Sequence, residues 1–260
     1  MGIQLGKQNK NIKSMETELN TLRTEASNNQ SQTPVSTPKP TDTPMPTPTE
    51  TPIPTPTSTP TPEPERYLVF VDPGHGGNSS TGATLTVNGE VKRIEKEDTL
   101  KFAFALKKAL EKLDIDVVMS REEDIKVENY DRATQANLAK ADYFIAIHRN
   151  SYSDESVKGV EMWIHSDGPV ADQEAAKKIL NALEEVGITK NRGVKLGSVG
   201  GGEDYAINSQ TEMPSGLLEL GFITNSEDNW NLDMYTTEYA TAIANAIKEW
   251  LIKYSDKKVQ

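Results

Sequence analysis

Two of the three histidines in this chain stand in segments that suit metal chemistry. His75 lies in VDPGHGG and His148 lies in FIAIHRNS, each directly after an apolar run, and Glu219 has a similar place in LLELGF. Histidine nitrogens and carboxylate oxygens are the usual ligands of an open zinc site, which leaves one position for water. The metal lowers the pKa of water to about 7, and a nearby glutamate can accept the proton. These residue types therefore predict metal-assisted hydrolysis.

An open zinc site needs a third protein ligand beside the two histidines. Three glutamates follow the His75 segment closely, namely Glu90, Glu95 and Glu97. Glu95, in RIEKEDTL, opens a predicted helix, where the helix dipole also favours a negative charge. The residue types alone leave the choice among the three open.

The hydrophobic pattern predicts the elements that must position these residues. Strands are expected at 66–71, 115–120, 142–147, 160–164 and 215–220, and helices at 95–113, 130–140, 171–186 and 239–254. Strands that alternate with helices predict an α/β fold, here one three-layer domain with a mostly parallel twisted sheet flanked by helices. Ligands bind beyond the carboxyl ends of such strands, so His75, His148 and Glu219 are expected at one edge of the sheet.

The first 64 residues differ in character from the rest. Residues 1–30 carry a faint heptad repeat, which is typical of a short coiled-coil stalk. Chains would self-associate through residues 5–26 of such a stalk. The alternative is a solvated helix that does not associate. Residues 31–64 form a Thr/Pro-rich linker in which each proline restrains the backbone to extended conformations, so this linker is expected to be disordered. The catalytic or binding domain is expected at 65–256. The heptad positions are Leu5, Ile12, Leu19 and Ala26.

Charge and composition exclude several classes of function. The net charge is −11, which argues against a nucleic-acid partner because phosphate binding needs a basic face. The chain has no cysteine, so disulfides and thiolate metal sites are excluded. No apolar run reaches the roughly 18 residues of a membrane span, and the first residues lack the apolar core of a signal peptide.

The region from about residue 66 to 254 resembles the catalytic domain of the zinc-dependent N-acetylmuramoyl-L-alanine amidases, which are bacterial cell-wall hydrolases. VDPGHGG followed later by an ELGF-type strand is the most specific part of the resemblance, and the pieces occur in the family's order. The matching pieces are VDPGHGG (71–77), EKEDTLKFA (95–103), SR (120–121), IHRNS (147–151), NRGVK (191–195) and MPSGLLELGFITN (213–225).

The resemblance implies a role for each matching residue. His75, Glu95 and His148 would hold one zinc ion, and Glu219 would be the catalytic carboxylate. The bond cleaved would be the amide between N-acetylmuramic acid and the L-alanine of the stem peptide. Peptidoglycan would be the substrate, and the protein would act outside the cytoplasm, at the cell wall or surface. A membrane anchor or wall tether is then expected upstream of residue 1.

Four further polar residues have less certain roles in this pattern. Arg149 stands where the family usually has a small residue, and its cation would contact a substrate carboxylate or narrow the groove. Asn150 would orient substrate, or else shape the turn. Arg121 is expected to pair with a carboxylate, and His165 is expected to be an ordinary surface or groove residue.

Three other functions compete with an active zinc amidase. A catalytically inactive or partner-activated relative would bind the cell wall without cutting it alone. A zinc peptidase of other specificity would use the same metal chemistry, since a fold does not fix a substrate. A purely structural stalked surface protein would suit the first 64 residues but would leave the histidine and glutamate constellation without a use.

Overall fold

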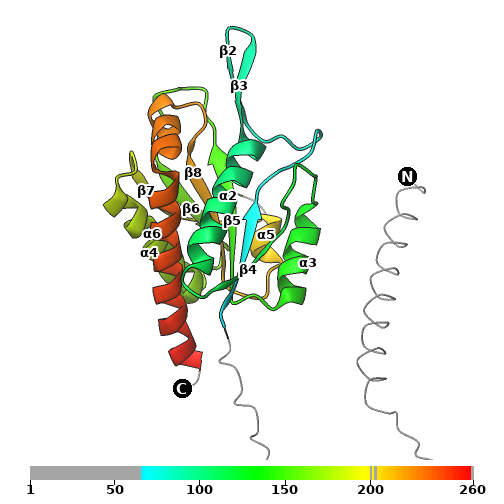
Figure 1. The fold of residues 1–260 in the computed structure, drawn as a ribbon, viewed down its shortest axis with the longest axis vertical. Helices are drawn as coiled ribbons and strands as arrows, with labels where there is room; N and C mark the ends of the chain where they lie inside the picture. The colour runs from blue at the N-terminus through cyan, green and yellow to red at the C-terminus, as the bar shows by residue number, and fades with distance from the viewer. Residues whose placement is uncertain (1–65, 200, 202–203, 259–260) are drawn as a thin grey trace, which may run out of the picture. The chain divides into compact units, whose positions relative to one another are not determined.

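The computed structural model describes residues 66–199, 201 and 204–258, with side chains described as far as residue 254. A central sheet of six strands has the order β4-β1-β5-β8-β6-β7 (Figure 1). All neighbouring strands run parallel except β6 and β8, which are antiparallel. These strands are β1 (Leu68–Pro73), β4 (Asp116–Met119), β5 (Tyr143–Asn150), β6 (Val160–Ile164), β7 (Asn191–Leu196) and β8 (Ser215–Phe222). The predicted, mostly parallel sheet is confirmed.

Helices cover both faces of this sheet, so the domain has the expected three layers. Three helices cover one face of the sheet, where α6 (Ser226–Lys258) packs against both α2 (Glu95–Glu111) and α4 (Val170–Val186). Two helices lie together on the other side: α3 (Asn129–Ala139) and α5 (Ala206–Ser209). Successive strand residues point to opposite faces, and β1 accordingly sends Val69 and Val71 into the core under α2 and Phe70 into the smaller core beside α3.

A separate two-stranded hairpin projects beyond the sheet (Figure 1). Strands β2 (Thr84–Val87) and β3 (Glu90–Ile94) pair antiparallel through a turn at Asn88 and Gly89, and β3 runs straight into α2. The sequence reasoning missed this hairpin because most of its residues are exposed and it has no apolar face to bury. It matters for the site because it leads into Glu95.

Several element bounds differ from the expected ones for identifiable reasons. Helix α6 begins at Ser226, where Asn225 accepts hydrogen bonds from the backbone N–H groups of Glu227 and Asp228 at 3.0 and 2.9 Å. It has a kink at Tyr235, whose backbone is not helical, and the helix expected at 239–254 is the part after this kink. Strands β5 and β8 run on to Asn150 and Phe222, so His148 lies within a strand rather than after it, and Glu219 lies before the last residues of its strand rather than at the end.

Some expectations lie outside what the structure describes. The stalk at 1–30, its self-association along 5–26 and the linker at 31–64 all fall on residues outside the described range. Among the described helices, none combines the length and hydrophobicity that crossing a bilayer requires.

Candidate metal centre

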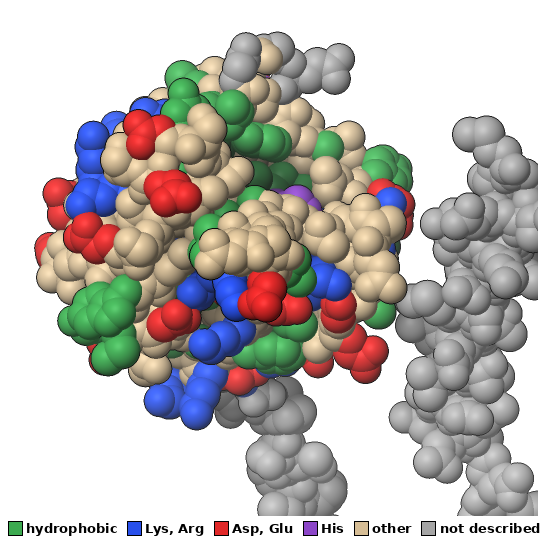
Figure 2. Space-filling model, turned by 90° about the horizontal axis from the view of Figure 1, so that it is seen from above, with side chains coloured by type: hydrophobic (Ala, Val, Ile, Leu, Met, Phe, Trp, Pro, Cys, Tyr) green, Lys and Arg blue, Asp and Glu red, His purple; other side chains and the backbone are tan. Residues whose placement is uncertain are grey.

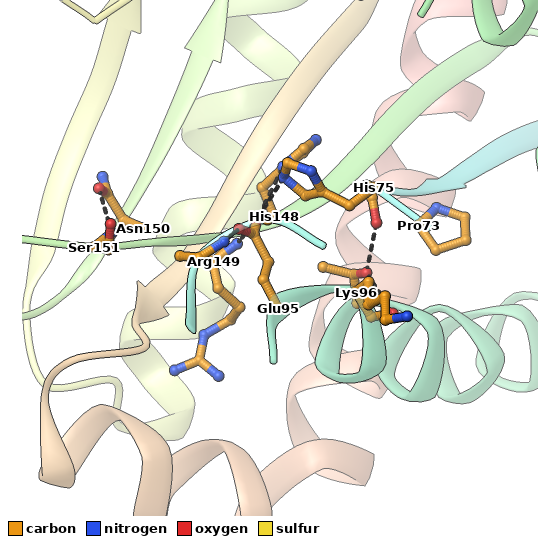
Figure 3. A network of polar contacts seen from close by, with 12 residues as sticks. Pro73, His75, Glu95, Lys96, His148, Arg149, Asn150 and Ser151 are labelled. Carbon is orange, nitrogen blue, oxygen red and sulfur yellow. Dashed lines mark hydrogen bonds and ion pairs between the residues drawn. The ribbon is translucent and has the colours of Figure 1, made fainter. Parts of the chain in front are cut away.

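His75, Glu95 and His148 converge on one point at the edge of the sheet (Figure 3). Glu95 Oε1 lies 3.2 Å from His75 Nε2 and 3.0 Å from His148 Nδ1. One ligand atom from each of the three residues lies within 4.8 Å of the other two, and the imidazole rings meet edge to face. Two imidazole nitrogens and one carboxylate oxygen can bind a metal ion and leave a coordination position open. Glu90 and Glu97, the other two candidates, are exposed and are not part of this group.

His75 is presented by a tight turn after β1. Its φ of 61° is in the left-handed region, which is unfavourable for a residue with a side chain and therefore needs support from its surroundings. Two buried arginines give that support by donating to the carbonyl groups of the turn. Arg121 donates to the Pro73 and Gly74 carbonyls at 3.0 Å each, and Arg132 donates to the His75 carbonyl at 2.7 Å.

This arrangement corrects the expected role of Arg121. Within the described part of the chain its guanidinium makes no ion pair and instead donates to backbone carbonyls, including that of Lys96 in α2 at 2.9 Å. Arg132 carries the carboxylate contact instead, in a buried pair with Asp72 of β1. Buried carbonyls need donors, and Arg121 supplies them to the segments that carry His75 and Glu95.

Two glycines leave room for the ligand side chains. A Cβ atom on Gly74 would lie 2.3 Å from the ring of His148, and one on Gly82 would lie 2.4 Å from Glu95 Oε2. Real Cβ atoms do not approach other atoms so closely. The VDPGHGG segment therefore depends on glycine at Gly74 because the imidazole of His148 occupies the space beside it.

Glu95 is buried at the first position of α2 with both of its carboxylate oxygens engaged. Oε1 also accepts from the Arg149 backbone N–H at 3.0 Å, and Oε2 accepts from the Ala83 N–H at 2.7 Å. Burial alone would raise the pKa of Glu95, but hydrogen bonds and charge from His148 and His75 hold that pKa well below its ordinary value. Glu95 is therefore ionised and oriented, as a metal ligand must be.

Glu219 has the opposite environment. It pairs in register with His148 on the neighbouring strand, it is 9 % exposed, and its Oε2 has no hydrogen-bond partner among the described residues. Burial, followed by the negative charges of Glu95 and Glu161, raises the pKa of Glu219 well above its ordinary value. A buried carboxylate oxygen without a partner is costly to stability, and such groups are more common at functional sites than elsewhere.

His75, Glu95, His148 and Glu219 line one cavity of about 540 Å³. Looking down on this end of the domain, Figure 2 shows histidine surface in a hollow with hydrophobic side chains on one side. The cavity thus has a polar part around the ligand candidates and an apolar part. The apolar part is lined by Val199, Tyr205, Ile207 and Leu217.

Arg149 does not reach this cavity with its charge, which corrects the expectation that it contacts a substrate or narrows the groove. Its guanidinium points away from the two histidines (Figure 3) and contacts Asp98, Asn229 Oδ1 at 2.6 Å and the Gly221 carbonyl at 3.3 Å. The side chain is buried, and its role is to join β5 to α2 and α6.

Asn150 does shape the turn, since its Oδ1 accepts from the Ser151 N–H at 2.8 Å (Figure 3). It also lines the cavity, with its Nδ2 donating to Glu161 at 3.0 Å. His165 lies away from the cavity, 3.1 Å from Asp204 and about a quarter exposed.

Sequence reasoning missed several residues around the site. Ser80, whose Oγ lies 3.4 Å from His75 Nδ1, and Arg132 stand in polar segments that resemble ordinary loops and helix surfaces. Glu161, which stands in an apolar strand in VEMWI, carried the one usable signal, because a charge in such a strand is unusual.

Comparison with known proteins gives a family that agrees with this geometry. The family model described as N-acetylmuramoyl-L-alanine amidase matches residues 69–249. The chain belongs to this family. The match contains every residue of the candidate metal centre and confirms the resemblance inferred from the sequence.

Curated relatives of this amidase-family chain include the "Probable cell wall amidase LytH" of Staphylococcus epidermidis, 32 % identical over 185 residues, or 70 % of this chain and 57 % of that protein. The protein of the same name from Staphylococcus aureus is 34 % identical over 163 residues, or 62 % of this chain and 49 % of that protein. The chain therefore spans about half the length of these relatives.

Solved structures of the family have the same fold. An N-acetylmuramoyl-L-alanine amidase from Clostridium difficile 630 superposes with a TM-score of 0.64 at 29 % identity, covering 72 % of this chain and 97 % of that one. The catalytic domain of CwlV from Bacillus (Paenibacillus) polymyxa gives a TM-score of 0.62 at 27 % identity, covering 71 % of this chain and 98 % of that one.

Proposed function

We propose that this protein is a zinc-dependent N-acetylmuramoyl-L-alanine amidase that acts on peptidoglycan. It would hydrolyse the amide between the lactyl group of N-acetylmuramic acid and the L-alanine of the stem peptide. The observation that carries the proposal is the buried Glu219, whose Oε2 lacks a partner among the described residues, beside His148 in a cavity that also holds His75 and Glu95. The family match agrees with it.

The donor set of the candidate metal centre fits zinc. Two imidazole nitrogens and one carboxylate oxygen, with nearby space in the cavity, are typical of catalytic zinc sites. Backbone N–H groups of Ala83 and Arg149 orient Glu95, in the manner of the outer contacts that fix metal ligands. Zinc bound by His75, Glu95 and His148 would polarise the scissile carbonyl and make water acidic enough to be deprotonated near neutral pH.

Glu219 would handle the proton in this reaction. Its carboxylate would accept the proton of the attacking water and then deliver it to the nitrogen of the departing alanine. The raised pKa makes Glu219 a stronger proton acceptor than an ordinary glutamate, and general acid–base catalysis gains as the pKa of such a group moves from its ordinary value toward the working pH. Arg149 would contribute indirectly, through its backbone N–H on Glu95.

The cavity walls suit a substrate that is part peptide and part sugar. The apolar side, with Val199, Tyr205 and Leu217, offers contacts for the methyl groups of the lactyl and alanine units. The polar side, with Ser80 and Asn150, offers hydrogen bonds to amide groups. Asn150 would therefore orient substrate as well as shape its turn. Such a substrate places the site of action outside the cytoplasm, at the cell wall.

The test is digestion of purified peptidoglycan by the full chain, before and after metal removal by a chelator and after zinc is restored. Released amino groups are identified by N-terminal labelling. We expect new N-terminal alanine, lost with the chelator and regained with zinc. Release of a different amino terminus would instead indicate a zinc peptidase, and no release by the zinc-loaded protein would contradict the proposed activity.

A further inference from the structure

A buried glutamate outside the cavity anchors part of its wall. Glu161 of β6 is 3 % exposed and does not line the cavity. Its Oε1 accepts from Asn150 Nδ2 at 3.0 Å and from Trp163 Nε1 at 3.1 Å, and its Oε2 accepts from Arg192 Nε at 2.8 Å. Glu161 therefore links strands β5, β6 and β7 through its two oxygens.

Glu161 also belongs to a row of paired residues that runs across the sheet from two residues of the site. The register pairs His148 of β5 with Glu219 of β8, and Glu219 in turn with Glu161 of β6. Residues paired directly across neighbouring strands project to the same face of a sheet. Glu161 therefore stands on the side of the sheet that carries His148 and Glu219, one strand beyond Glu219.

The contact with Glu161 fixes the orientation of the Asn150 amide. A carboxylate oxygen only accepts and the backbone N–H of Ser151 only donates, so Nδ2 must face Glu161 and Oδ1 must face Ser151. Nδ2 carries two hydrogens, and the contact with Glu161 uses one. Within the described residues the second has no acceptor, and Asn150 lines the cavity together with His148 and Glu219.

Arg192 holds the Glu161 oxygen that does not contact Asn150. Its Nε contacts Glu161 Oε2, and its guanidinium lies 5.0 Å from the centre of the Phe222 ring. Asn150 and Phe222 are themselves partners in the register of β5 and β8. The chain of contacts from Phe222 through Arg192 and Glu161 thus ends at the amide of Asn150.

We propose that Glu161, braced by Arg192, is a positioning residue that aims the second N–H of Asn150 at a carbonyl oxygen of the bound substrate. This inference rests on the proposed function, because a muramoyl-peptide supplies carbonyl oxygens on and beside the scissile bond. A donor that is fixed before the reaction stabilises negative charge as it develops on such an oxygen, and loss of one such donor typically slows turnover about 10²–10³-fold. Misorientation should have a smaller effect.

The test compares four variants of the full chain in the zinc-loaded form: Glu161→Gln, Asn150→Ala, the double variant and Glu184→Gln. Glutamine has one acceptor oxygen, so Glu161→Gln cannot satisfy both Arg192 and Asn150 while keeping the volume of the side chain. Glu184→Gln is the matched control. Glu184 also accepts a hydrogen bond from an asparagine amide, that of Asn191 at 2.9 Å, but this contact is exposed and lies away from the cavity.

Three quantities are measured: zinc content, the kinetics of alanine-terminus release from a soluble muramoyl-peptide, and hydrogen exchange of the Asn150 side-chain amide by NMR. We expect Glu161→Gln to lower kcat about tenfold, with KM changed less than about twofold and zinc content unchanged. Because loss of the Glu161 charge also lowers the pKa of Glu219, kcat is compared at the pH optimum of each variant. At that pH the same substitution in the Asn150→Ala background should have almost no further effect, because residues that act through one another are not additive.

The proposal would be overturned if the losses of kcat in the two single variants multiplied in the double variant. It would also be overturned if Glu161→Gln had the same kcat as Glu184→Gln. If the wild-type protein releases no alanine terminus, the proposed function fails on its own, and NMR still decides the role of Glu161. Exchange of the Asn150 amide should then be faster in Glu161→Gln than in the wild type or the control, and unchanged exchange would contradict the positioning role.

Discussion

The two sides of the candidate site are built on opposite principles. On the side of β1 and α2, Glu95 has hydrogen bonds on both oxygens, and buried arginines hold the turn that carries His75. On the side of β8, Glu219 is also buried but has an oxygen with no partner in the described part of the chain. The pKa of Glu95 lies far below its ordinary value, and that of Glu219 lies well above it.

This contrast separates holding a metal from moving a proton. A ligand must be ionised and fixed, and hydrogen bonds to the charged form achieve both. A general base must still be able to take up a proton, which requires that its charged form is not over-stabilised. The proposed function therefore gives the two glutamates of one cavity different roles, in line with their different surroundings.

We call the side with His75, Glu95 and His148 the metal side and the side with Glu219 the proton-transfer side. Glu219→Gln should abolish proton transfer and leave the metal side intact. We expect kcat to fall about 10²–10⁴-fold, the range of a lost general acid–base group, while zinc binding is retained. Steady-state release of alanine termini measures the first, and metal analysis of the purified variant measures the second. A variant that retains more than about a tenth of wild-type kcat would argue against this role for Glu219.

Arg132→Met should weaken the metal side through the fold. It leaves the carboxylate of Asp72 buried without its charged partner and removes the donor to the His75 carbonyl. Breaking a buried ion pair in this way typically costs about 3–5 kcal/mol of unfolding free energy, which urea denaturation would measure. Arg66→Met is the control, because its exposed pair with Asp116 should contribute about 0–1 kcal/mol. Equal losses in the two variants would contradict the special role of Arg132.

Gly74→Ala should affect metal affinity more than stability. The added methyl would collide with the ring of His148, so that ring must leave the position in which it contacts Glu95 or the turn must shift. We expect zinc affinity, measured by competition with a chromophoric chelator, to fall about 10–100-fold, as when the groups that orient metal ligands are lost. Gly89→Ala, at the hairpin tip with open space beside its Cα, introduces backbone strain but should leave zinc affinity unchanged. A similar loss of affinity in both variants would show that the effect is not local.

The smallest expected effect is on the pH dependence of stability, which tests whether the pKa of Glu219 is raised in the folded protein. Because the pKa of Glu219 is raised in the folded protein, the stability it contributes is present below its ordinary pKa of about 4.3 and is lost as pH rises toward the raised value. Metal-free Glu219→Gln should therefore be more stable than the metal-free wild type at pH 7 and equally stable near pH 4. The difference at pH 7 should be about 1.4 kcal/mol for every unit by which folding raises the pKa of Glu219. Urea denaturation at both pH values checks this, and a variant less stable at pH 7 would contradict it.

The strand–helix alternation and the family motif were enough to predict the three-layer fold and to bring His75, His148 and Glu219 to one edge of the sheet. The choice of Glu95 over Glu90 and Glu97 depended on the family resemblance. The structure shows the reason, since only Glu95 among these begins α2 beside the two histidines.

Long-range contacts were beyond the reach of sequence patterns. The roles of Arg121, Arg132 and Arg149 depend on partners tens of residues away, which hydrophobic periodicity does not encode. The exposed hairpin of β2 and β3 also carried no burial pattern. The zinc itself, and the roles of the ligand candidates and Glu219, stay predictions from chemistry and family.

The most direct test of the divided roles is a paired measurement of bound zinc and turnover in Glu95→Gln and Glu219→Gln. We expect Glu95→Gln to lose zinc and activity together, and Glu219→Gln to keep about one zinc per chain while losing turnover. If Glu219→Gln lost its zinc, or if Glu95→Gln kept both zinc and turnover, the assignment of one glutamate to the metal and the other to the proton would be wrong.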